Sequence, residues 1–228
     1  MDFNIEPVAL LGLPVLLFAI VVHEVAHAVV AFWGGDDTAS LQGRITLDPM
    51  SHIDPVGTVL MPIIGMLTGL PLIGWAKPVP VNTTRLKNST WDVYVSIAGP
   101  ISNVLQAILA VLLLALMHFI FPDVYPYGII RGQEFTVPSG IMSMLYLGII
   151  INLVLAFFNM IPLPPLDGHW VASHFFLRPG NWLDQFYTAI QPINYIVLIG
   201  VVIVLGRTGV FGSIIGGVSN FALDMIFN

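Results

Sequence analysis

The amino-acid sequence predicts an all-α polytopic membrane protein with about five to six membrane segments, including a re-entrant element within residues 57–82. The first observation is composition, since 57% of the 228 residues are hydrophobic and only 9% are charged. Soluble domains are roughly half apolar and a quarter charged, so a water-soluble globule is excluded. The second observation is a series of long apolar runs. The third is that no polar linker or internal repeat divides residues 1–228, which predicts a single domain.

Residues 8–33 form the first predicted span, and they are apolar apart from His23, Glu24 and His27. As a helix they extend about 39 Å at 1.5 Å per residue, which exceeds the roughly 30 Å of a hydrocarbon core. A cleaved signal peptide is the rival interpretation. It is not expected, because the apolar run is too long and acidic residues occupy the start where a signal peptide carries basic ones.

The second predicted span covers residues 93–121 and is interrupted by Gly99 and Pro100. A capping box from Ser89 to Asp92 is expected at its start. In this motif a serine and an acidic residue three positions later bind the free backbone N–H groups of the first turn.

Three further apolar stretches follow. Residues 139–161 form a third span without any ionisable side chain. Residues 189–206 and 208–227 are separated only by the region around Arg207, so they are either two spans or one span followed by an amphipathic tail.

The segment from residue 57 to 74 is 18 residues long and carries no charge. It contains Pro62, Gly65, Gly69 and Pro71, which favour breaks over one continuous helix. We expect this segment to enter the membrane and return to the same side. Non-helical backbone is tolerated at membrane depth only where protein or water covers it, so the segment must pack against the other spans.

Charge and cysteine content narrow the possible chemistry. Seven Lys and Arg against 13 Asp and Glu give a net charge of −6. No basic cluster exists that could neutralise a run of phosphates, which excludes a nucleic-acid partner. Because the chain has no cysteine, a metal site must use His, Asp or Glu.

The sequence His23-Glu24-Val25-Ala26-His27 in the first span is a candidate metal site. The spacing of four residues puts both imidazoles on one face of a helix, where they can bind one ion. In zinc hydrolases with this pattern the glutamate is the general base. An ionisable side chain at the bilayer centre costs about 2.5 to 3.5 kcal/mol, so three of them together favour a bound metal over a cluster that only packs helices.

A catalytic zinc ion usually has three protein ligands and leaves the fourth position to water. The candidates outside the first span are Asp54, Asp92, Asp167, His52, His118, His169 and His174. Asp167 stands out because it follows a proline-rich break at the end of an uncharged span and precedes Gly168. Irregular backbone at such a break can turn a carboxylate inward, although an ordinary interfacial loop aspartate is the alternative.

These residues together resemble the site-2 proteases, which are intramembrane zinc metalloproteases. His23, Glu24 and His27 match the metal-binding motif of the family. Its second motif, whose aspartate is the third zinc ligand, is similar to Asn159-x-x-Pro162-x-x-x-Leu166-Asp167-Gly168. Segments of one prokaryotic branch resemble Gly74-Trp75-Ala76-Lys77-Pro78-Val79-Pro80-Val81-Asn82 and Ala98-Gly99-Pro100-x-x-Asn103. The resemblance covers about residues 15–175, and no appended PDZ or CBS domain is expected.

The resemblance implies a single integral-membrane metalloprotease domain over residues 1–228. One Zn²⁺ per chain would be held by His23, His27 and Asp167, with Glu24 as the catalytic base. The expected reaction is hydrolysis of a peptide bond in or near a transmembrane segment of a membrane-protein substrate, within the lipid bilayer of a prokaryotic cell. Asn103 would donate to the developing oxyanion or to the substrate backbone, or else form an interhelical hydrogen bond that stabilises packing.

Two other functions are considered. A prenyl-protein peptidase also carries H-E-x-x-H in a membrane, but it typically uses a glutamate as third ligand, and this chain has only Glu6, Glu24 and Glu134. A non-proteolytic zinc carrier or scaffold is the alternative from another class. A carrier needs ligands along a path to both faces of the membrane, which the first and third spans lack beyond the histidine cluster. The sequence does not specify an oligomeric state.

The metal site also predicts the topology. His27 lies near the end of the first span and Asp167 lies just past the third, so a shared metal requires both helices to end on one side of the membrane. That requires residues 57–74 to be re-entrant. The metal side then carries the basic residues Arg44, Lys77, Arg85, Lys87 and Arg178, with Arg131 and Arg207 opposite. The positive-inside rule puts the metal site nearer the cytoplasmic face and the amino terminus outside.

Residues 75–82 have two interpretations. Val79 and Val81 would offer a strand edge on which an extended substrate adds. Pro78 and Pro80 limit the available donors, so a plain connecting loop is the alternative.

Overall fold

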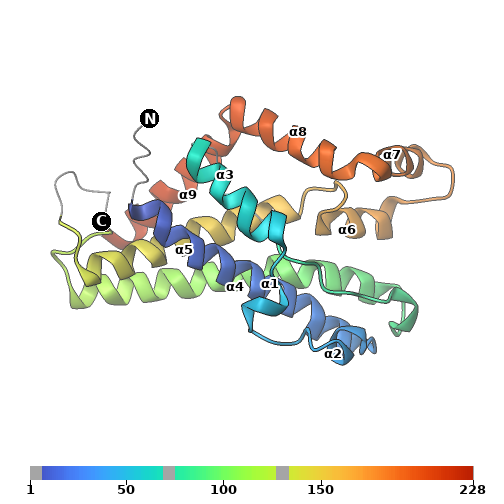
Figure 1. The fold of residues 1–228 in the computed structure, drawn as a ribbon, viewed down its shortest axis with the longest axis horizontal. Helices are drawn as coiled ribbons and strands as arrows, with labels where there is room; N and C mark the ends of the chain where they lie inside the picture. The colour runs from blue at the N-terminus through green and yellow to red at the C-terminus, as the bar shows by residue number, and fades with distance from the viewer. Residues whose placement is uncertain (1–6, 69–74, 127–133, 228) are drawn as a thin grey trace.

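The computed structural model describes residues 7–68, 75–126 and 134–227. These residues form helices and connections with no strand, so the predicted all-α class is confirmed. The three longest helices are α1 (Pro7–Gly34), α4 (Thr90–Ile120) and α5 (Val137–Asn159). They pack against one another along the long axis of the molecule (Figure 1).

Small residues allow α4 and α5 to approach closely. A Cβ atom at Gly148 of α5 would lie 3.6 Å from the Ala110 Cβ of α4, which is ordinary contact distance. Leu114 and Met142 fill the core beside this crossing, and both are fully buried. Close helix contact through small residues is typical of membrane proteins, where the lipid gives no hydrophobic drive to associate.

The start of α4 differs from the expected capping box. The Ser89 side chain makes no cap hydrogen bond, and Asp92 donates its backbone N–H to the Ser89 carbonyl oxygen instead. The reason is that Ser89 has helical torsion angles of −65° and −18°, whereas a capping serine needs an extended conformation. The prediction was therefore wrong here. The helix also continues through Pro100, so the expected interruption is not a break.

A short helix follows the loop after α1. It begins as a π-helical element, η2 (Pro55–Leu60), and continues directly as α3 (Met61–Thr68). The backbone N–H of Trp75 donates to the Gly57 carbonyl oxygen at 3.3 Å, and the Thr58 hydroxyl donates to the Trp75 carbonyl oxygen at 2.8 Å. The two ends of the predicted re-entrant segment thus lie side by side, which a full crossing would not allow. Residues 69–74, which join them, lie outside the described residues.

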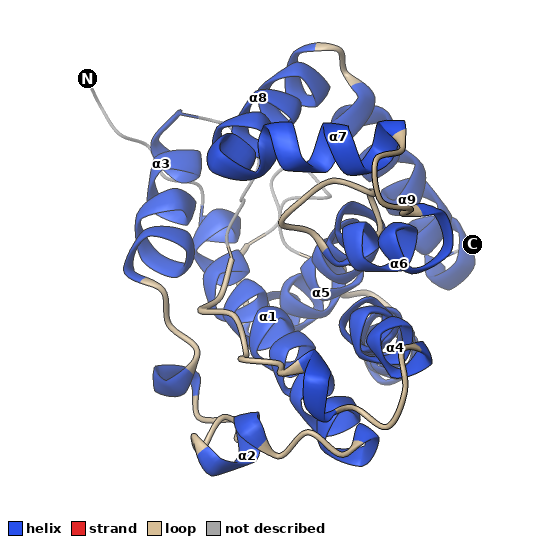
Figure 2. Cartoon of the chain, turned by 90° about the vertical axis from the view of Figure 1, so that its right-hand side faces the viewer, coloured by secondary structure: helices blue, strands red, loops and turns tan. Residues whose placement is uncertain are grey.

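The carboxyl-terminal part contains α6 (Asp167–Phe176), α7 (Trp182–Ile190), α8 (Asn194–Arg207) and α9 (Val210–Phe227). In the end-on view, α7 and α8 lie on the opposite side of the molecule from α2 and the end of α1 (Figure 2). The helix α9 returns to pack against α4 and α5. The shorter elements are α2 (Thr38–Leu41), η1 (Pro49–Ser51), η3 (Thr83–Arg85) and η4 (Gln191–Ile193).

Four stretches of the described residues are long and apolar enough to cross a membrane, namely Leu10–Gly34, Thr90–Ile120, Val137–Asn159 and Trp182–Arg207. They correspond to the predicted spans 8–33, 93–121, 139–161 and 189–206, and the last begins earlier because α7 and η4 precede α8. The remaining predicted segment, 208–227, is the helix α9 and is not among the four.

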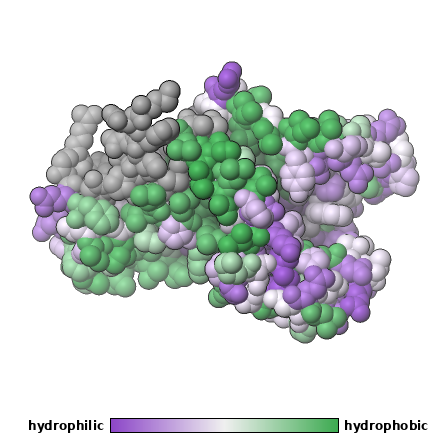
Figure 3. Space-filling model, viewed as in Figure 1, coloured by the Kyte–Doolittle hydropathy of each residue, from purple (hydrophilic) through white to green (hydrophobic). Residues whose placement is uncertain are grey.

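The surface of the molecule is divided into an apolar part and a polar part. Hydrophobic residues cover much of the side formed by the long helices, and hydrophilic residues gather towards the end where α2 lies (Figure 3). Exposed apolar side chains run along α4, among them Leu105, Ile108, Leu109 and Leu112. Such a surface is stable only in contact with lipid, so the chain is an integral multi-pass membrane protein.

Candidate metal centre

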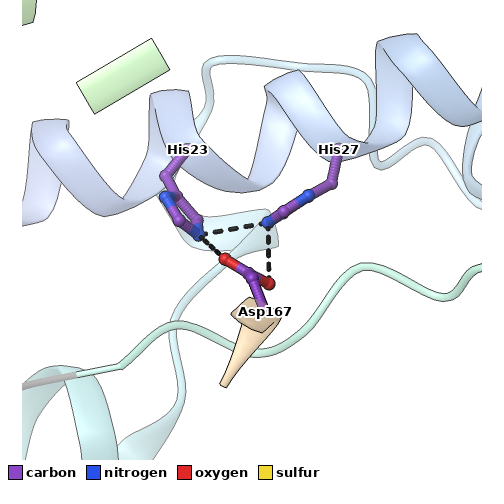
Figure 4. A group of neighbouring side chains, drawn as sticks. All are labelled: His23, His27 and Asp167. Atoms are coloured by element: carbon purple, nitrogen blue, oxygen red, sulfur yellow. Dashed lines mark hydrogen bonds and ion pairs between the residues drawn. The ribbon is translucent and has the colours of Figure 1, made fainter. Parts of the chain in front are cut away.

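Three side chains from distant parts of the sequence meet at one point (Figure 4). His23 and His27 project from one face of α1, and Asp167 is the first residue of α6. The Nε2 atoms of the two imidazoles lie 3.1 Å apart. The Asp167 carboxylate oxygens lie 3.2 Å from His23 Nε2 and 3.3 Å from His27 Nε2. The structure therefore brings together the three residues that the sequence predicts as metal ligands.

The orientation of His23 depends on two side-chain amides. Asn152 donates an N–H to the Gly148 carbonyl oxygen at 2.9 Å, and its own oxygen accepts from Asn103 Nδ2 at 2.8 Å. The Asn103 oxygen therefore points at His23 Nδ1, 2.6 Å away. Because an amide oxygen only accepts, Nδ1 carries the proton and Nε2 presents its lone pair to the site.

His27 is oriented in the same way by the main chain. Its Nδ1 lies 2.6 Å from the Val95 carbonyl oxygen, which also only accepts. In the neutral imidazoles both Nε2 lone pairs then face the Asp167 carboxylate. The Oδ2 atom of Asp167 is buried and has no hydrogen-bond donor. Lone pairs gathered in this way repel one another unless a cation lies between them.

This donor set fits zinc. Ligand atoms that bind one zinc ion at about 2.0–2.2 Å lie roughly 3.3 Å apart in a tetrahedral site, close to the three separations observed. Two imidazoles and one carboxylate are a common set at catalytic zinc sites, which keep a fourth position open. Within the described ranges, this is the one group of three or more His, Asp or Glu side chains placed to hold a metal ion.

Gly99 allows α4 to approach the two histidines. A Cβ atom at this position would lie 2.4 Å from His27 Nε2 and 2.5 Å from His23 Nε2. Real Cβ atoms essentially never come so close to another heavy atom. Any side chain at residue 99 would therefore occupy the space beside both ligand nitrogens.

A second glycine directs Asp167 towards α1. A Cβ atom at Gly168 would lie 2.3 Å from the Met160 carbonyl oxygen. The loop between α5 and α6 is therefore tightly folded at this point. Within it, Leu166 N donates to the Leu163 carbonyl oxygen at 2.8 Å. The proline-rich break thus turns the carboxylate inward, as the sequence predicts.

Glu24 is held by the main chain of the 75–82 segment. Its Oε2 atom accepts the backbone N–H of Val79 at 2.8 Å. Val79 stands between Pro78 and Pro80, which have no N–H. The segment therefore presents a donor to Glu24 at one fixed place.

Two further hydrogen bonds anchor the 75–82 segment. Lys77 N donates to the His52 carbonyl oxygen at 2.8 Å, and Asn82 N donates to Asp36 Oδ2 at 2.6 Å. No strand pairing involves the segment within the part of the chain that the structure describes. It is an extended connection that is tied to the loop after α1.

Asp36 is fully buried at the end of α1. Its Oδ1 atom accepts hydrogen bonds from the Thr38 backbone and hydroxyl, and its Oδ2 atom accepts from Asn82. Burial raises the pKa of a carboxyl, but these hydrogen bonds outweigh it and hold the pKa of Asp36 below its ordinary value. The ionised carboxylate therefore ties the 75–82 segment to α1.

A cavity of about 670 Å³ opens beside the metal ligands and Glu24. Its wall is mainly aliphatic and comes from α3, α5 and α8, including Ile64, Leu147, Ile151, Val154, Leu198, Val202 and Ile203. The ring of Trp75 packs over Gly57, where a Cβ atom would lie 2.4 Å away, and its centroid is 6.2 Å from that of Tyr195 on α8. The site thus faces an apolar space large enough for several side chains.

The contacts of Asn103 support its packing role. The residue has no exposed surface, it is not part of the cavity wall, and both ends of its amide are bonded. The interhelical hydrogen bond that was the alternative is present, and it acts on a candidate metal ligand. The contact with an oxyanion or substrate stays a prediction.

The other candidate ligands lie outside this group of three. His52 bonds the Thr46 carbonyl oxygen, and His118 packs against Phe227 at the far end of α4. His169 packs against Tyr187, and burial lowers its pKa. His174 packs against Phe175, Asp54 caps η2, and Asp92 lines the cavity.

Three groups of the site were not identified from the sequence. The Val95 carbonyl and the Val79 N–H belong to the main chain, so their residue types carry no signal. Asn152 did carry one, because it is a polar side chain within an otherwise apolar span.

The fold and the site define a class, namely polytopic membrane proteins with a metal centre of two histidines from one span and an aspartate that follows another. Residues 11–204 match the family model described as "Peptidase family M50". The chain therefore belongs to peptidase family M50, the site-2 protease family, which confirms the resemblance seen in the sequence.

Bacterial relatives agree with this assignment. The chain is 43% identical over 155 residues to "Putative zinc metalloprotease YwhC" of Bacillus subtilis, a match covering 68% of this chain and 64% of the relative. It is 29% identical over 182 residues to "Putative zinc metalloprotease Rip2" of Mycobacterium tuberculosis, covering 77% of this chain and 62% of the relative. The chain thus spans less than two thirds of the length of these relatives. No solved structure matches it.

Proposed function

We propose that this chain is a zinc endopeptidase that hydrolyses a peptide bond in or near a transmembrane segment of a membrane-protein substrate. The observation that carries the proposal is the contact of His23, His27 and Asp167, with both Nε2 atoms and the carboxylate directed at one point. Membership of peptidase family M50 and the names of the relatives support the chemistry. The proposal includes one zinc ion per chain, since a single set of three such ligands occurs among the residues that the structure describes.

Each residue at the site has a definable task. When bound, zinc supplies a Lewis acid that polarises the scissile carbonyl and lowers the pKa of the attacking water. Glu24 has one oxygen held by Val79, and the other accepts a proton from that water and later passes it to the leaving amine. Asn103 and the Val95 carbonyl keep the histidine lone pairs directed inward throughout.

The cavity supports an apolar substrate. Its aliphatic wall suits the side chains of a transmembrane segment. A helix has all its backbone groups paired, so the substrate must unwind locally before its carbonyl is exposed to attack.

The 75–82 segment lies beside this substrate path, but few of its donors remain. Lys77 and Val79 already donate to His52 and Glu24, and the two prolines have none to give. Pairing with a substrate strand would therefore use mainly carbonyl groups of the segment. The shortage of free donors favours the other role of the 75–82 segment, which is to be the connection that holds Glu24.

The proposed orientation puts the metal site nearer the cytoplasmic face and the amino terminus outside. It is supported by the positive-inside rule, since Arg44, Lys77, Arg85 and Lys87 lie in the connections on the side where α1 ends and α4 begins. Arg131, which was expected on the other side, lies outside the described residues.

The alternatives have less support. A zinc carrier needs further ligands towards both faces, and the described residues contain no second group suited to a metal. A prenyl-protein peptidase would use a glutamate as third ligand, whereas Asp167 takes that position.

Zinc content and proteolysis test the proposal together. The detergent-purified chain is expected to hold about one zinc, and His27→Ala and Asp167→Ala are expected to lose it or bind it far more weakly. Glu24→Gln should keep the metal and lose cleavage of transmembrane substrates. Full zinc affinity in Asp167→Ala would refute the ligand set. Equal cleavage by Glu24→Gln and wild type would refute the mechanism.

A further inference from the structure

The wall of the cavity carries an unbalanced set of charges. Three carboxylates line it, those of Glu24, Asp92 and Asp167, together with the imidazoles of His23 and His27. No lysine or arginine is among the described residues of the wall. The space where a substrate would lie is therefore surrounded by acidic groups.

Two of the three carboxylates belong to the metal centre. A divalent cation bound by two neutral imidazoles and Asp167 is balanced by that carboxylate and by Glu24 beside it. Asp92 takes no part in this balance, so it adds a third carboxylate to a mainly apolar wall. An unpaired charge in such surroundings is costly, and a cationic partner removes the cost.

Asp92 lies close to the metal ligands but separate from them. It is in the first turn of α4, three residues before Val95, whose carbonyl holds His27. Gly99, whose Cβ position would lie 2.4 to 2.5 Å from both ligand nitrogens, follows Asp92 by seven residues, a rise of about 10.5 Å. Asp92 is therefore roughly two helical turns from the catalytic centre, at the end of α4 that faces the connections outside the membrane.

The carboxyl group of Asp92 is incompletely satisfied. Its Oδ1 atom is buried and has no hydrogen-bond partner. The start of a helix favours a negative charge, but the macrodipole supplies no donor to this oxygen. His174 of α6 acts on the charge of Asp92 electrostatically, yet it makes no hydrogen bond to the buried oxygen.

Much of the remaining wall is apolar, with Leu147, Ile203 and Ile215 among its residues. A substrate segment that fills the cavity would thus place apolar residues against this part of the wall and meet Asp92 at the start of α4. Transmembrane segments have this character, because their cytoplasmic flanks are enriched in Lys and Arg.

We propose that Asp92 is a specificity-determining residue that binds a lysine or arginine side chain on the membrane-proximal flank of the substrate. This inference rests on the proposed proteolytic function and adds a substrate class to it. An extended chain rises about 3.3 Å per residue, and a lysine side chain spans about two such residues. The basic residue therefore lies about two to four residues from the scissile bond, on the flank that leaves the membrane beside α4.

The test uses the full chain with zinc bound and a substrate consisting of one transmembrane segment. A single lysine is moved through each flanking position, and the same positions carry glutamine in the reference substrates. The value of kcat/KM for the best-placed lysine substrate is expected to be about tenfold that of its glutamine counterpart, equivalent to about 1.4 kcal/mol.

Substitutions at residue 92 should change this preference. In Asp92→Asn the ratio of lysine to glutamine substrate should fall to about one, and in Asp92→Lys a glutamate at the same position should become preferred. Asp123→Asn is the matched control, because Asp123 is exposed in the turn after α4 and should leave the ratio unchanged. The inference would be overturned if Asp92→Asn kept the wild-type ratio of kcat/KM for the lysine and glutamine substrates. An equal loss of activity on both substrates would keep that ratio and would count against the inference too.

A binding measurement separates this inference from the proposed function. The affinities of the lysine and glutamine substrates are measured on Glu24→Gln and on Glu24→Gln combined with Asp92→Asn. If Glu24→Gln binds the lysine substrate more tightly and the double variant does not, the role of Asp92 is supported. This holds even if wild type cleaves neither substrate, an outcome that would refute the proposed protease activity. Cleavage by wild type without any lysine preference refutes the role of Asp92 alone.

Discussion

His23 and Asn103 are joined by a hydrogen bond of 2.6 Å between the imidazole Nδ1 and the amide oxygen, entirely inside the helix bundle. The bond fixes the tautomer of a metal ligand from a neighbouring span. Partners of this kind usually change metal affinity by about 10- to 100-fold when they are removed.

We therefore expect Asn103→Leu to bind zinc about 10- to 100-fold more weakly than wild type, measured by competition with a chelator. Gln106→Leu is the control, because Gln106 lies on the same helix and contacts Ala19 without touching His23. Wild-type affinity in Asn103→Leu would show that His23 keeps its orientation without the amide.

Gly99→Ala should remove zinc binding more completely. Its Cβ atom would lie within 2.5 Å of the Nε2 atoms of both histidines, so α4 must move away or the rings must turn. Gly148→Ala offers a comparison within the same bundle, since its Cβ atom would have ordinary contacts of 3.6 Å or more. Zinc content per purified chain measures the difference, and equal content in both variants would contradict this explanation of Gly99.

Val79→Pro should lower kcat about 10- to 100-fold while zinc is retained, because it deletes the N–H that holds Glu24 and leaves the ligands untouched. Val79→Ala keeps the N–H and should keep most of the activity. If both variants lose activity to the same extent, the Val79 side chain is what matters, and the hydrogen bond is not.

Asp36→Asn should weaken the attachment of the 75–82 segment and destabilise the protein by about 1–3 kcal/mol at neutral pH, since charge-assisted bonds to Thr38 and Asn82 are lost. The folded-state pKa of Asp36 is lowered. The stabilisation is therefore fully present above its ordinary value of 3.8 and is lost as pH falls through the folded value.

Thermal unfolding of wild type and Asp36→Asn in detergent, from pH 7 to acid, checks this prediction. The difference in midpoint between the two proteins should shrink below about pH 4. If the difference in midpoint does not change with pH, the negative charge of Asp36 does not contribute to the stability of the protein.

Much of the fold and the ligand set could be predicted because they depend on local patterns. Apolar runs longer than the hydrocarbon core indicate the spans, and the spacing of four residues places His23 and His27 on one face. The re-entrant segment followed from the requirement that His27 and Asp167 meet. Its hydrogen-bonded ends at Gly57 and Trp75 agree with that requirement.

Other features depend on contacts that a sequence does not display. The capping box at Ser89 failed because the preceding connection gives that residue helical torsion angles. The role of Asn103 depends on Asn152 in another helix, which sets the direction of its amide. The Val79 N–H and the Val95 carbonyl are present in any residue type at those positions, so only the three-dimensional structure identifies them.

The separation of the ligands along the chain has a consequence for biosynthesis. The ribosome completes His23 and His27 in the first span long before Asp167 is made, and three further elements must enter the membrane in the meantime. During that interval two imidazoles and Glu24 reside in the nascent bundle without their third ligand. The proposed metal site is therefore complete only late in assembly, once the loop after α5 has folded back onto α1.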